Sequence, residues 1–284
     1  MSSPRAFVIG WPIAHSRSPL IHNYWLRSLQ LPGSYEKIAV EPDGLALFLA
    51  DFHGLGFAGG NVTLPHKELA FAQCAKKTKI ANALQAVNTL WMDGGELCGD
   101  NTDVAGFLAS LDADAAGWGQ ACEKAVVLGA GGAARAIVAG LMSRGVPQIA
   151  IVNRTADRGE ALIAQMRSFD SRTKLALSDY AALAKLLAEA DLLVNTTSLG
   201  MKGQPKLDVD LTPLPAHAVV ADIVYAPLET DMLKAARARG LKTSGGLGML
   251  LHQAVPGFAR WFGIEPHVTP ELYALVARDI EASP

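Results

Sequence analysis

Amine and carboxylate side chains in the first third of the chain have the types needed for acid–base chemistry on a small molecule. Lys67 comes just after Pro65, which ends a predicted strand, and Asp103 closes the polar segment Asp-Asn-Thr-Asp. A positioned amine or carboxylate can move a proton to or from a reacting oxygen. Each also has a structural interpretation, Lys67 as a solvated helix residue and Asp103 as a helix cap.

Two serines near the start of the chain could bind an anionic group. Ser16 and Ser18 fall on one side of an extended segment, because side chains alternate there and the residue before Pro19 avoids the α region. Both hydroxyls could therefore meet one carboxylate. Ser18 also stands where a helix N-cap belongs, with Pro19 at the first helical position, and capping explains it equally well.

Three further polar side chains lie on predicted strands. Asn61 and Thr63 share one face of the predicted strand 60–64, and Asn88 lies in the predicted strand 86–91. Amide and hydroxyl groups could hold the hydroxyls of a small ligand. Asn88 is equally typical of a turn or bulge.

A glycine-rich turn follows the predicted strand 125–128 and opens the predicted helix 132–142. Glycines let the backbone approach a pyrophosphate, and the N–H groups and dipole of the helix favour its negative charge. The spacing of Gly129, Gly131 and Ala134 is a loose match to the dinucleotide-binding motif, so a tight turn without a ligand is the alternative. The cofactor residues predicted here are Gly129, Ala130, Gly131, Gly132 and Ala133.

The end of the next predicted strand, 148–152, selects between the two nicotinamide cofactors. NAD enzymes usually place Asp or Glu about 20 residues after the glycines, on the ribose 2′-hydroxyl. Here Asn153, Arg154 and Thr155 follow the strand, with Arg158 one turn later. A guanidinium suits a 2′-phosphate and can stack on adenine, so these residues predict NADP. The alternative, arginines that only solvate a helix start, conflicts with the helix dipole.

Alternating strand-like and helical segments position these residues. The first region is predicted to contain strands 6–9, 35–40, 60–64, 86–91 and 96–99 with helices 19–29 and 44–52. Asp93-Gly94-Gly95 signals a hairpin between the last two strands, so this sheet is predicted to be mixed.

A second series begins at Ala125 and predicts a doubly wound, Rossmann-like nucleotide domain. Its predicted strands are 125–128, 148–152, 174–177, 191–195 and 218–223, with the apolar runs of buried parallel strands. Helices over 249–262 and 270–280 follow, with no predicted strand left to cover. The fold class is therefore α/β with two domains: a substrate domain over 1–105, a nucleotide domain over 106–246, and C-terminal helices over 247–284 that return to the first domain.

Composition restricts the class of protein. The 284 residues carry a formal charge of −2 with scattered Lys and Arg, which argues against nucleic-acid binding. Three widely spaced cysteines form no zinc or disulfide pattern, so no metal is expected and a reducing cytoplasm fits. No apolar run approaches the ~20 residues that span a bilayer, so no membrane role is expected. Gly10 and Pro12 interrupt the stretch that resembles a signal peptide.

The sequence resembles the shikimate dehydrogenase family over essentially its whole length, because it carries a series of similar motifs in the same order. The resembling segments are Pro-Ile-Ala-His-Ser-Arg-Ser-Pro from 12, Asn-Val-Thr-Leu-Pro-His-Lys from 61, Ala-Val-Asn-Thr-Leu from 86, Asp-Asn-Thr-Asp from 100, the glycine-rich turn at 129, Asn-Arg-Thr at 153, Asn-Thr-Thr-Ser-Leu-Gly-Met at 195, Asp222-Ile-Val-Tyr225 and Gly246-Leu-Gly-Met-Leu-Leu-His-Gln253.

The resemblance implies an NADP-dependent oxidoreductase that interconverts 3-dehydroshikimate and shikimate, with Lys67 and Asp103 as the catalytic pair. The substrate residues that it implies are Ser16, Ser18, Asn61, Thr63, Lys67, Asn88, Asp103, Tyr225 and Gln253. For NADP(H) it implies the glycine-rich turn, the segment from Asn153 to Arg158, and nicotinamide contacts at Ile223, Gly246 and Met249. The partner is then a small-molecule substrate, and the chain is expected to be a monomer or a homodimer.

Three residues depart from the family's usual pattern. Val104 replaces a common glycine and is expected to tighten the loop that holds Asp103, since a β-branched residue is stiff and avoids positive φ. His66 replaces phenylalanine, and Lys79 replaces an acidic residue near the cofactor. None of the three removes a catalytic group.

Two points stay open at the level of sequence. Lys67 could protonate the ring oxygen with Asp103 holding its ammonium, or Asp103 could accept the proton with Lys67 as electrostatic partner. In function, the alternatives are a quinate/shikimate dehydrogenase using NAD or both cofactors, and a catalytically silent sensor of NADP or a ring acid. Arg154 argues against the first, and the presence of both Lys67 and Asp103 against the second.

Overall fold

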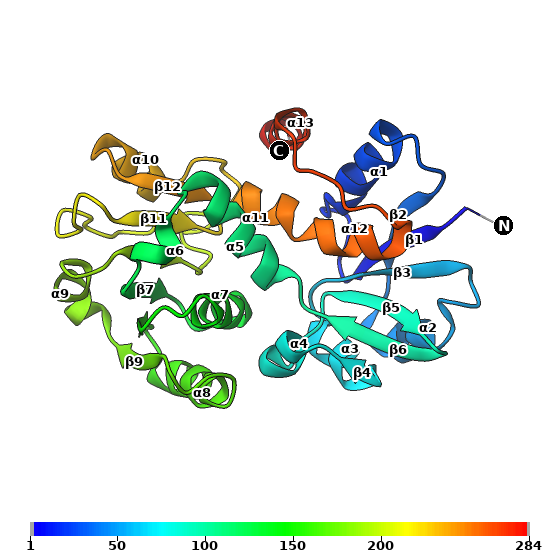
Figure 1. Ribbon diagram of the computed structural model, residues 1–284, viewed down its shortest axis with the longest axis horizontal. Coiled ribbons are helices and arrows are strands. Elements are labelled where there is room, and N and C mark those ends of the chain that lie inside the picture. Colours follow the sequence, from blue (N-terminus) through cyan, green and yellow to red (C-terminus); the bar gives the residue numbers. More distant parts are fainter. Residues whose placement is uncertain (1–2, 283–284) are drawn as a thin grey trace. The chain divides into compact units, whose positions relative to one another are not determined.

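The computed structural model describes residues 3–282 (Figure 1). Within that range the chain forms two compact units. Unit 1 comprises the residues up to Thr102 together with Gln253–Val276, and unit 2 comprises Asp103–His252 together with the residues from Ala277. Among the described residues, no helix is both long enough and apolar enough for a membrane span.

Unit 1 is built on a six-stranded mixed sheet in the order β2-β1-β3-β5-β6-β4. Its strands are β1 (Arg5–Gly10), β2 (Ser34–Ala39), β3 (Phe57–Val62), β4 (Lys76–Lys77), β5 (Thr89–Asp93) and β6 (Glu96–Asp100). β1 is parallel to β2 and β3, whereas β5 is antiparallel to β3 and β6. Gly94 and Gly95 join β5 to β6 with φ of 60° and 82°, as a two-residue hairpin requires. The predicted mixed sheet is confirmed.

Helices cover both faces of this sheet. They are α1 (Ser18–Ser28), α2 (Leu45–Asp51), α3 (Lys67–Gln73), α4 (Lys79–Leu84) and α12 (Ala254–Phe262), with a short 3-10 turn η1 (Pro42–Gly44). Side chains alternate along β1, so Phe7 is buried with Leu49 on one face and Val8 with Trp261 on the other. Trp261 Nε1 also donates to Leu90 O at 3.0 Å, which fixes α12 on the sheet.

Unit 2 is a parallel sheet in the order β12-β11-β10-β7-β8-β9. Its strands are β7 (Lys124–Leu128), β8 (Gln148–Val152), β9 (Lys174–Ser178), β10 (Leu192–Asn195), β11 (Val219–Asp222) and β12 (Lys242–Gly245). Counted from β7, this is the 3-2-1-4-5-6 order of dinucleotide-binding folds, read from the other edge. The predicted Rossmann-like fold is confirmed, and the strand order reverses between β7 and β10.

The helices of unit 2 precede β7 or follow β7, β8, β9, β11 and β12. They are α5 (Asp103–Asp114), α6 (Trp118–Ala121), α7 (Gly132–Ser143), α8 (Ala156–Arg167), η2 (Tyr180–Ala182), α9 (Leu183–Leu187), α10 (Asp231–Ala238) and α11 (Gly246–His252). The last helix of the chain, α13 (Pro270–Ala282), begins in unit 1.

Several predicted boundaries differ from those observed. Asn88 precedes β5 instead of lying within a strand, and the predicted helix 249–262 is two helices, of which α11 begins at Gly246. α11 packs on α5 within unit 2, so the return to the first sheet begins with α12. The predicted domain limits at 105/106 and 246/247 fall inside α5 and α11, and the division into three segments stays a prediction.

Candidate functional site

The predicted site residues of unit 1 gather at one edge of its sheet, here called its carboxyl edge. The carboxyl ends of β1, β3 and β6 share this edge with the amino end of β5, because β5 runs antiparallel to its neighbours. Trp11 N donates to Leu64 O at 3.1 Å and Thr63 N donates to Ile9 O at 2.9 Å. These bonds join the segment after β1, which carries the two predicted serines, to the segment after β3, which carries Lys67.

Asn88 has a fixed amide orientation at this edge. Its Oδ1 accepts hydrogen bonds from Thr89 Oγ1 at 2.9 Å, Thr102 N at 2.8 Å and Thr102 Oγ1 at 3.1 Å. A backbone N–H can only donate, so the atom it meets must be the oxygen. The amide nitrogen of Asn88 is thereby oriented as a donor, the role predicted for it toward a substrate hydroxyl.

Asn61 uses its amide to join strands. Its Nδ2 donates to Asn88 O at 2.9 Å and to Thr89 Oγ1 at 3.2 Å, and its Oδ1 accepts from the Tyr35 hydroxyl at 2.5 Å. Asn61 is 5% exposed. The structure therefore gives it a scaffold role beneath Asn88, and a direct substrate contact stays a prediction.

Tyr35 is a site residue that the sequence reasoning missed. It is 2% exposed, and burial raises the pKa of its phenol well above 10.0, opposed by hydrogen bonding with Ser18 and Asn61. His22 stacks on its ring at 4.0 Å between centroids. The only signal in the sequence was a tyrosine on a predicted strand, which is typical of core packing.

Ser18 does not cap α1, which was the alternative interpretation of this residue. The N-cap of α1 is Arg17, and it makes no side-chain cap hydrogen bond. Ser18 is the first helical residue, its N–H donates to Ser16 Oγ at 3.4 Å, and its hydroxyl interacts with the phenol of Tyr35. The capping interpretation fails because the helix begins at Ser18, one residue earlier than Pro19 suggested. A polar role at the carboxyl edge becomes the better account of Ser18.

Lys67 begins α3 directly after the turn that follows β3. Its side chain is half-buried, and its carbonyl accepts from Val87 N at 3.0 Å. His66 is fully buried, and its Nε2 donates to Val40 O at 2.7 Å. The histidine that departs from the family pattern thus holds the turn before Lys67 against the chain after β2.

Asp103 is the first residue of α5 and belongs to unit 2. Val104 adopts no positive φ, and the expected tightening of the loop stays a prediction. It lies in the first turn of α5, where its Cγ1 would be 3.4 Å from a Cβ added at Gly140. Val104 thus lies beside Gly140 of α7. Lys79 is exposed in the first turn of α4.

The two remaining predicted substrate residues lie in different units. Tyr225 follows β11 in unit 2, and Gln253 is the N-cap of α12 in unit 1. Both side chains are half-buried.

The glycine-rich turn of unit 2 follows β7 at the point where the strand order reverses. Gly129 has φ of +105°, and a Cβ there would lie 2.8 Å from Thr196 Oγ1. Gly131 and Gly132 are exposed, and a Cβ at Gly131 would meet nothing within 4 Å. The N-cap of α7 makes no side-chain hydrogen bond, and its first turn has no acidic residue. This combination suits an anion at the helix start.

The predicted 2′-phosphate residues follow β8, the neighbouring strand. Gly129 N donates to Val152 O at 2.8 Å, which ties the glycine-rich turn to the end of β8. Arg154 and Arg158 are exposed beyond it, at the start of α8. Burial raises the pKa of Tyr180, and the nearby Arg154 guanidinium opposes this shift. Tyr180, from the turn after β9, was not predicted.

The predicted nicotinamide residues follow the last two strands of the sheet. Ile223 follows β11, and Gly246 begins α11 directly after β12. A Cβ at Gly246 would lie 2.1 Å from Ile223 O, so only glycine permits this contact. Met249 is half-buried one turn along α11. All predicted nucleotide residues thus lie at the carboxyl ends of four strands, where open α/β sheets bind ligands.

Two family models match the chain. The model described as "Shikimate dehydrogenase substrate binding domain" matches residues 8–90, and "Shikimate / quinate 5-dehydrogenase" matches residues 114–202. A relative from Methylocella silvestris, named Shikimate dehydrogenase (NADP(+)), is 59% identical over 280 residues, which cover 99% of this chain and 98% of the relative. The chain belongs to the shikimate dehydrogenase family.

Other members of the family agree in sequence and in fold. A relative of the same name from Azorhizobium caulinodans is 50% identical over 278 residues, with 98% of this chain and 97% of the relative covered. The structure of shikimate 5-dehydrogenase from Thermus thermophilus with NADP(H) and shikimate matches with a TM-score of 0.83 at 35% identity, covering 98% and 99% of the two chains. Quinate dehydrogenase from Corynebacterium glutamicum with NAD matches with a TM-score of 0.88 at 30% identity, covering 98% and 100%.

Proposed function

We propose that this chain is an NADP-dependent shikimate dehydrogenase that reversibly reduces 3-dehydroshikimate to shikimate. The observation that carries the proposal is the carboxyl edge of unit 1, where the segments that carry Ser16, Lys67 and Asn88 lie at the ends of β1, β3 and β5. The 59% identity to a relative of that name supports it. So does the similar fold of a shikimate 5-dehydrogenase in complex with NADP(H) and shikimate.

NADP(H) fits the carboxyl edge of unit 2. The glycine-rich turn and the uncapped start of α7 suit its diphosphate, and Arg154 with Arg158 suits its 2′-phosphate. When bound, NADPH supplies the hydride that reduces the ring carbonyl. Ile223, Gly246 and Met249 are the residues we assign to the nicotinamide.

We assign the transfer of the proton to Lys67 and Asp103. Reduction of a ketone adds a hydride to carbon and a proton to oxygen, so an acid must stand at that oxygen. In our assignment Lys67 Nζ gives the proton during reduction and takes it back during oxidation, while Asp103 stabilises the ammonium. The alternative assignment makes Asp103 the proton carrier. Ser16 and Ser18 bind the substrate carboxylate, and the Asn88 amide donates to a ring hydroxyl.

We also propose that the protein works in the cytoplasm. Its three cysteines are buried and form no disulfide, and burial raises the pKa of Cys74 to about 11 and of Cys122 to about 12. Such thiols stay protonated and unreactive, which suits a reducing compartment. A monomer or homodimer remains our prediction for its assembly.

Initial rates with shikimate and with quinate, each with NADP and with NAD, test the proposed function. We expect the highest kcat/KM for shikimate with NADP. A higher kcat/KM for quinate with NAD would assign the chain to quinate dehydrogenase instead. Absence of turnover in all four combinations, with NADP still bound, would indicate a sensor.

A further inference from the structure

A buried carboxylate closes the loop that follows β11. Asp222 is 2% exposed. Its Oδ1 accepts from Val224 N at 3.0 Å and from Asn195 Nδ2 at 2.9 Å, and its Oδ2 accepts from Thr230 Oγ1 at 2.8 Å. Thr230 is the N-cap of α10, so one side chain binds both the start and the end of the loop that carries Ile223 and the predicted Tyr225.

The Asn195 amide extends this contact to the neighbouring strand. Its Oδ1 accepts from Thr197 N at 3.0 Å and from Thr197 Oγ1 at 2.7 Å. That pairing fixes which atom is the nitrogen, and the nitrogen donates to Asp222. The end of β10 and the loop after β11 are thus locked to one another.

Thr196 extends the same chain of contacts to the glycine-rich turn. Its hydroxyl donates to Leu128 O at 2.6 Å, and the Gly129 backbone approaches so closely that a Cβ would lie 2.8 Å from Thr196 Oγ1. An unbroken series of contacts therefore runs from the turn assigned to the diphosphate to the loop assigned to the nicotinamide.

Folding alone does not require a carboxylate at this position. Burial of a charged group is costly, and it raises the pKa of Asp222 above its usual value, opposed by the hydrogen bonds from Val224, Thr230 and Asn195. Well-packed apolar residues often replace such groups at no loss of stability. A fully satisfied buried network instead specifies one geometry.

We propose that Asp222 is a positioning residue for the cofactor: with Asn195 and Thr230 it sets the place of the Ile223–Tyr225 segment relative to the glycine-rich turn. The proposal rests on the proposed function, because it assumes that the two segments bind the diphosphate and the nicotinamide of one dinucleotide. The role depends on geometry and not on charge. An asparagine at 222 keeps an oxygen for the Val224 and Asn195 donors, and the Thr230 hydroxyl can turn to accept from its nitrogen.

Calorimetric binding of two ligands tests the proposal on the full chain. NADP engages both segments, whereas adenosine 2′,5′-bisphosphate carries the 2′-phosphate but no nicotinamide. Asp222→Ala should weaken NADP binding on the order of tenfold, the loss of one to two hydrogen-bonded contacts, and leave the bisphosphate unchanged. It should also lower kcat on the order of 10²-fold, as a misplacement of about 1 Å does. Asp222→Asn should restore both values.

The matched control is Asp210→Ala. Asp210 is exposed and also accepts hydrogen bonds from a backbone N–H and a hydroxyl, both of Thr212. This variant should bind both ligands as wild type does. Thermal unfolding shows whether Asp222→Ala folds. If it does not, Thr230→Val removes one of the three donors to Asp222. This variant should weaken NADP binding by less than tenfold and leave bisphosphate binding unchanged.

Equal weakening of both ligands in the folded variant, or no loss for either, would overturn the positioning role. So would an Asp222→Asn variant as impaired as Asp222→Ala, because the role would then be electrostatic. A wild-type chain that binds neither ligand would instead count against the proposed function, whatever the variants do.

Discussion

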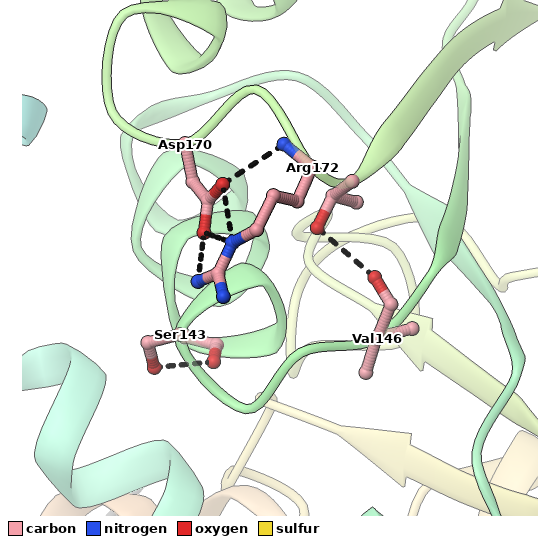
Figure 2. Close-up of polar contacts among 6 residues, drawn as sticks. Ser143, Val146, Asp170 and Arg172 are labelled. Atoms are coloured by element: carbon pink, nitrogen blue, oxygen red, sulfur yellow. Dashed lines mark hydrogen bonds and ion pairs between the residues drawn. The ribbon is translucent and has the colours of Figure 1, made fainter.

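The two edges of the unit 2 sheet use polar side chains in different ways. At the amino edge, where β8 and β9 begin, Arg172 binds Asp170 two residues away (Figure 2). The Arg172 side chain is 84% exposed. At the carboxyl edge, Asn195 and Asp222 are 0% and 2% exposed and are bonded across 27 residues of sequence. Exposed ion pairs at the amino edge thus contrast with a buried carboxylate–amide pair at the carboxyl edge.

This difference distinguishes ion pairs that only stabilise a turn from buried groups that fix the geometry of a binding site. An exposed ion pair contributes about 0–1 kcal/mol, so the amino edge tolerates its loss. A buried amide or carboxylate is costly unless every hydrogen bond is made, and such groups persist where a geometry must be specified. Unit 1 repeats the contrast, with the part-exposed pair Arg5–Glu36 near the start of β1 and buried Asn61 at the carboxyl edge.

The largest effect should come from Lys67 at the carboxyl edge of unit 1. Lys67→Ala should lower kcat by on the order of 10²–10⁴, the usual contribution of a positioned acid or base, with a smaller change in KM. The control is Lys124→Ala, at the amino edge of unit 2, where the exposed ammonium pairs with Glu189. Steady-state kinetics of the control should match wild type.

A double-mutant cycle sharpens this prediction. Asp103→Asn should lose activity to a similar extent, and the double variant should lose much less than the product of the single losses, since a broken pair cannot be broken twice. If Lys67→Ala kept near-normal kcat and only raised KM, Lys67 would be a binding residue and the proton would belong to Asp103 or a water.

His22 supports the carboxyl edge of unit 1 from beneath, through its stack on Tyr35. Burial lowers the pKa of His22 to about 3 from 6.5, opposed in part by the Asn61 amide. The unfolded chain therefore takes up a proton below pH 6.5 that the folded chain refuses until about pH 3. Folding stability from this group is complete above pH 6.5 and falls by about 1.4 kcal/mol per pH unit on the way to pH 3.

Urea unfolding at pH 7 and at lower pH checks this. His22→Phe keeps the stack and should lose less stability on acidification than wild type. His15→Gln, at an exposed position, should follow the wild-type curve. If the free energy of unfolding fell equally with decreasing pH in wild type and in His22→Phe, His22 would not be the group responsible.

A smaller effect is expected from the serines that follow β1. Ser16→Ala should raise KM for shikimate about tenfold, the loss of a hydrogen bond to a charged group, with little change in kcat. Ser34→Ala, at the start of β2, serves as the matched control because its hydroxyl only donates to Glu36. Equal turnover of shikimate and its methyl ester by wild type would show that no carboxylate contact exists.

The sequence predicted those parts of the fold whose signals are local. The glycine-rich turn, the hairpin at Gly94–Gly95 and the apolar runs of β7 and β8 each lie within a few neighbouring residues. β12 was missed because Lys-Thr-Ser-Gly has no apolar run, and its pairing with β11 supplies the strand. Tertiary pairing overrode weak local propensity there.

The sequence predicted which residues form the candidate site. It did not predict which of them join the strands and which are available for a ligand. Asn61 and Asn88 look alike in sequence, yet Asn61 joins three strands while the Asn88 oxygen accepts from Thr89 and Thr102. Tyr35 meets Asn61 across 26 residues, and Asp222 meets Asn195 across 27. No pattern of spacing reports such long-range pairs, because they arise only once the strands are ordered.

A matched pair of arginines tests the contrast between the two edges most directly. Arg154 and Arg172 are both exposed in unit 2, the first after β8 and the second before β9. Measuring kcat/KM with NADP and with NAD, we expect Arg154→Ala to lower the preference for NADP by roughly 10- to 100-fold, the loss of charge-assisted hydrogen bonds to a phosphate. Arg172→Ala should leave that preference unchanged. Equal losses with both cofactors for Arg154→Ala, or a shifted preference for Arg172→Ala, would contradict the account.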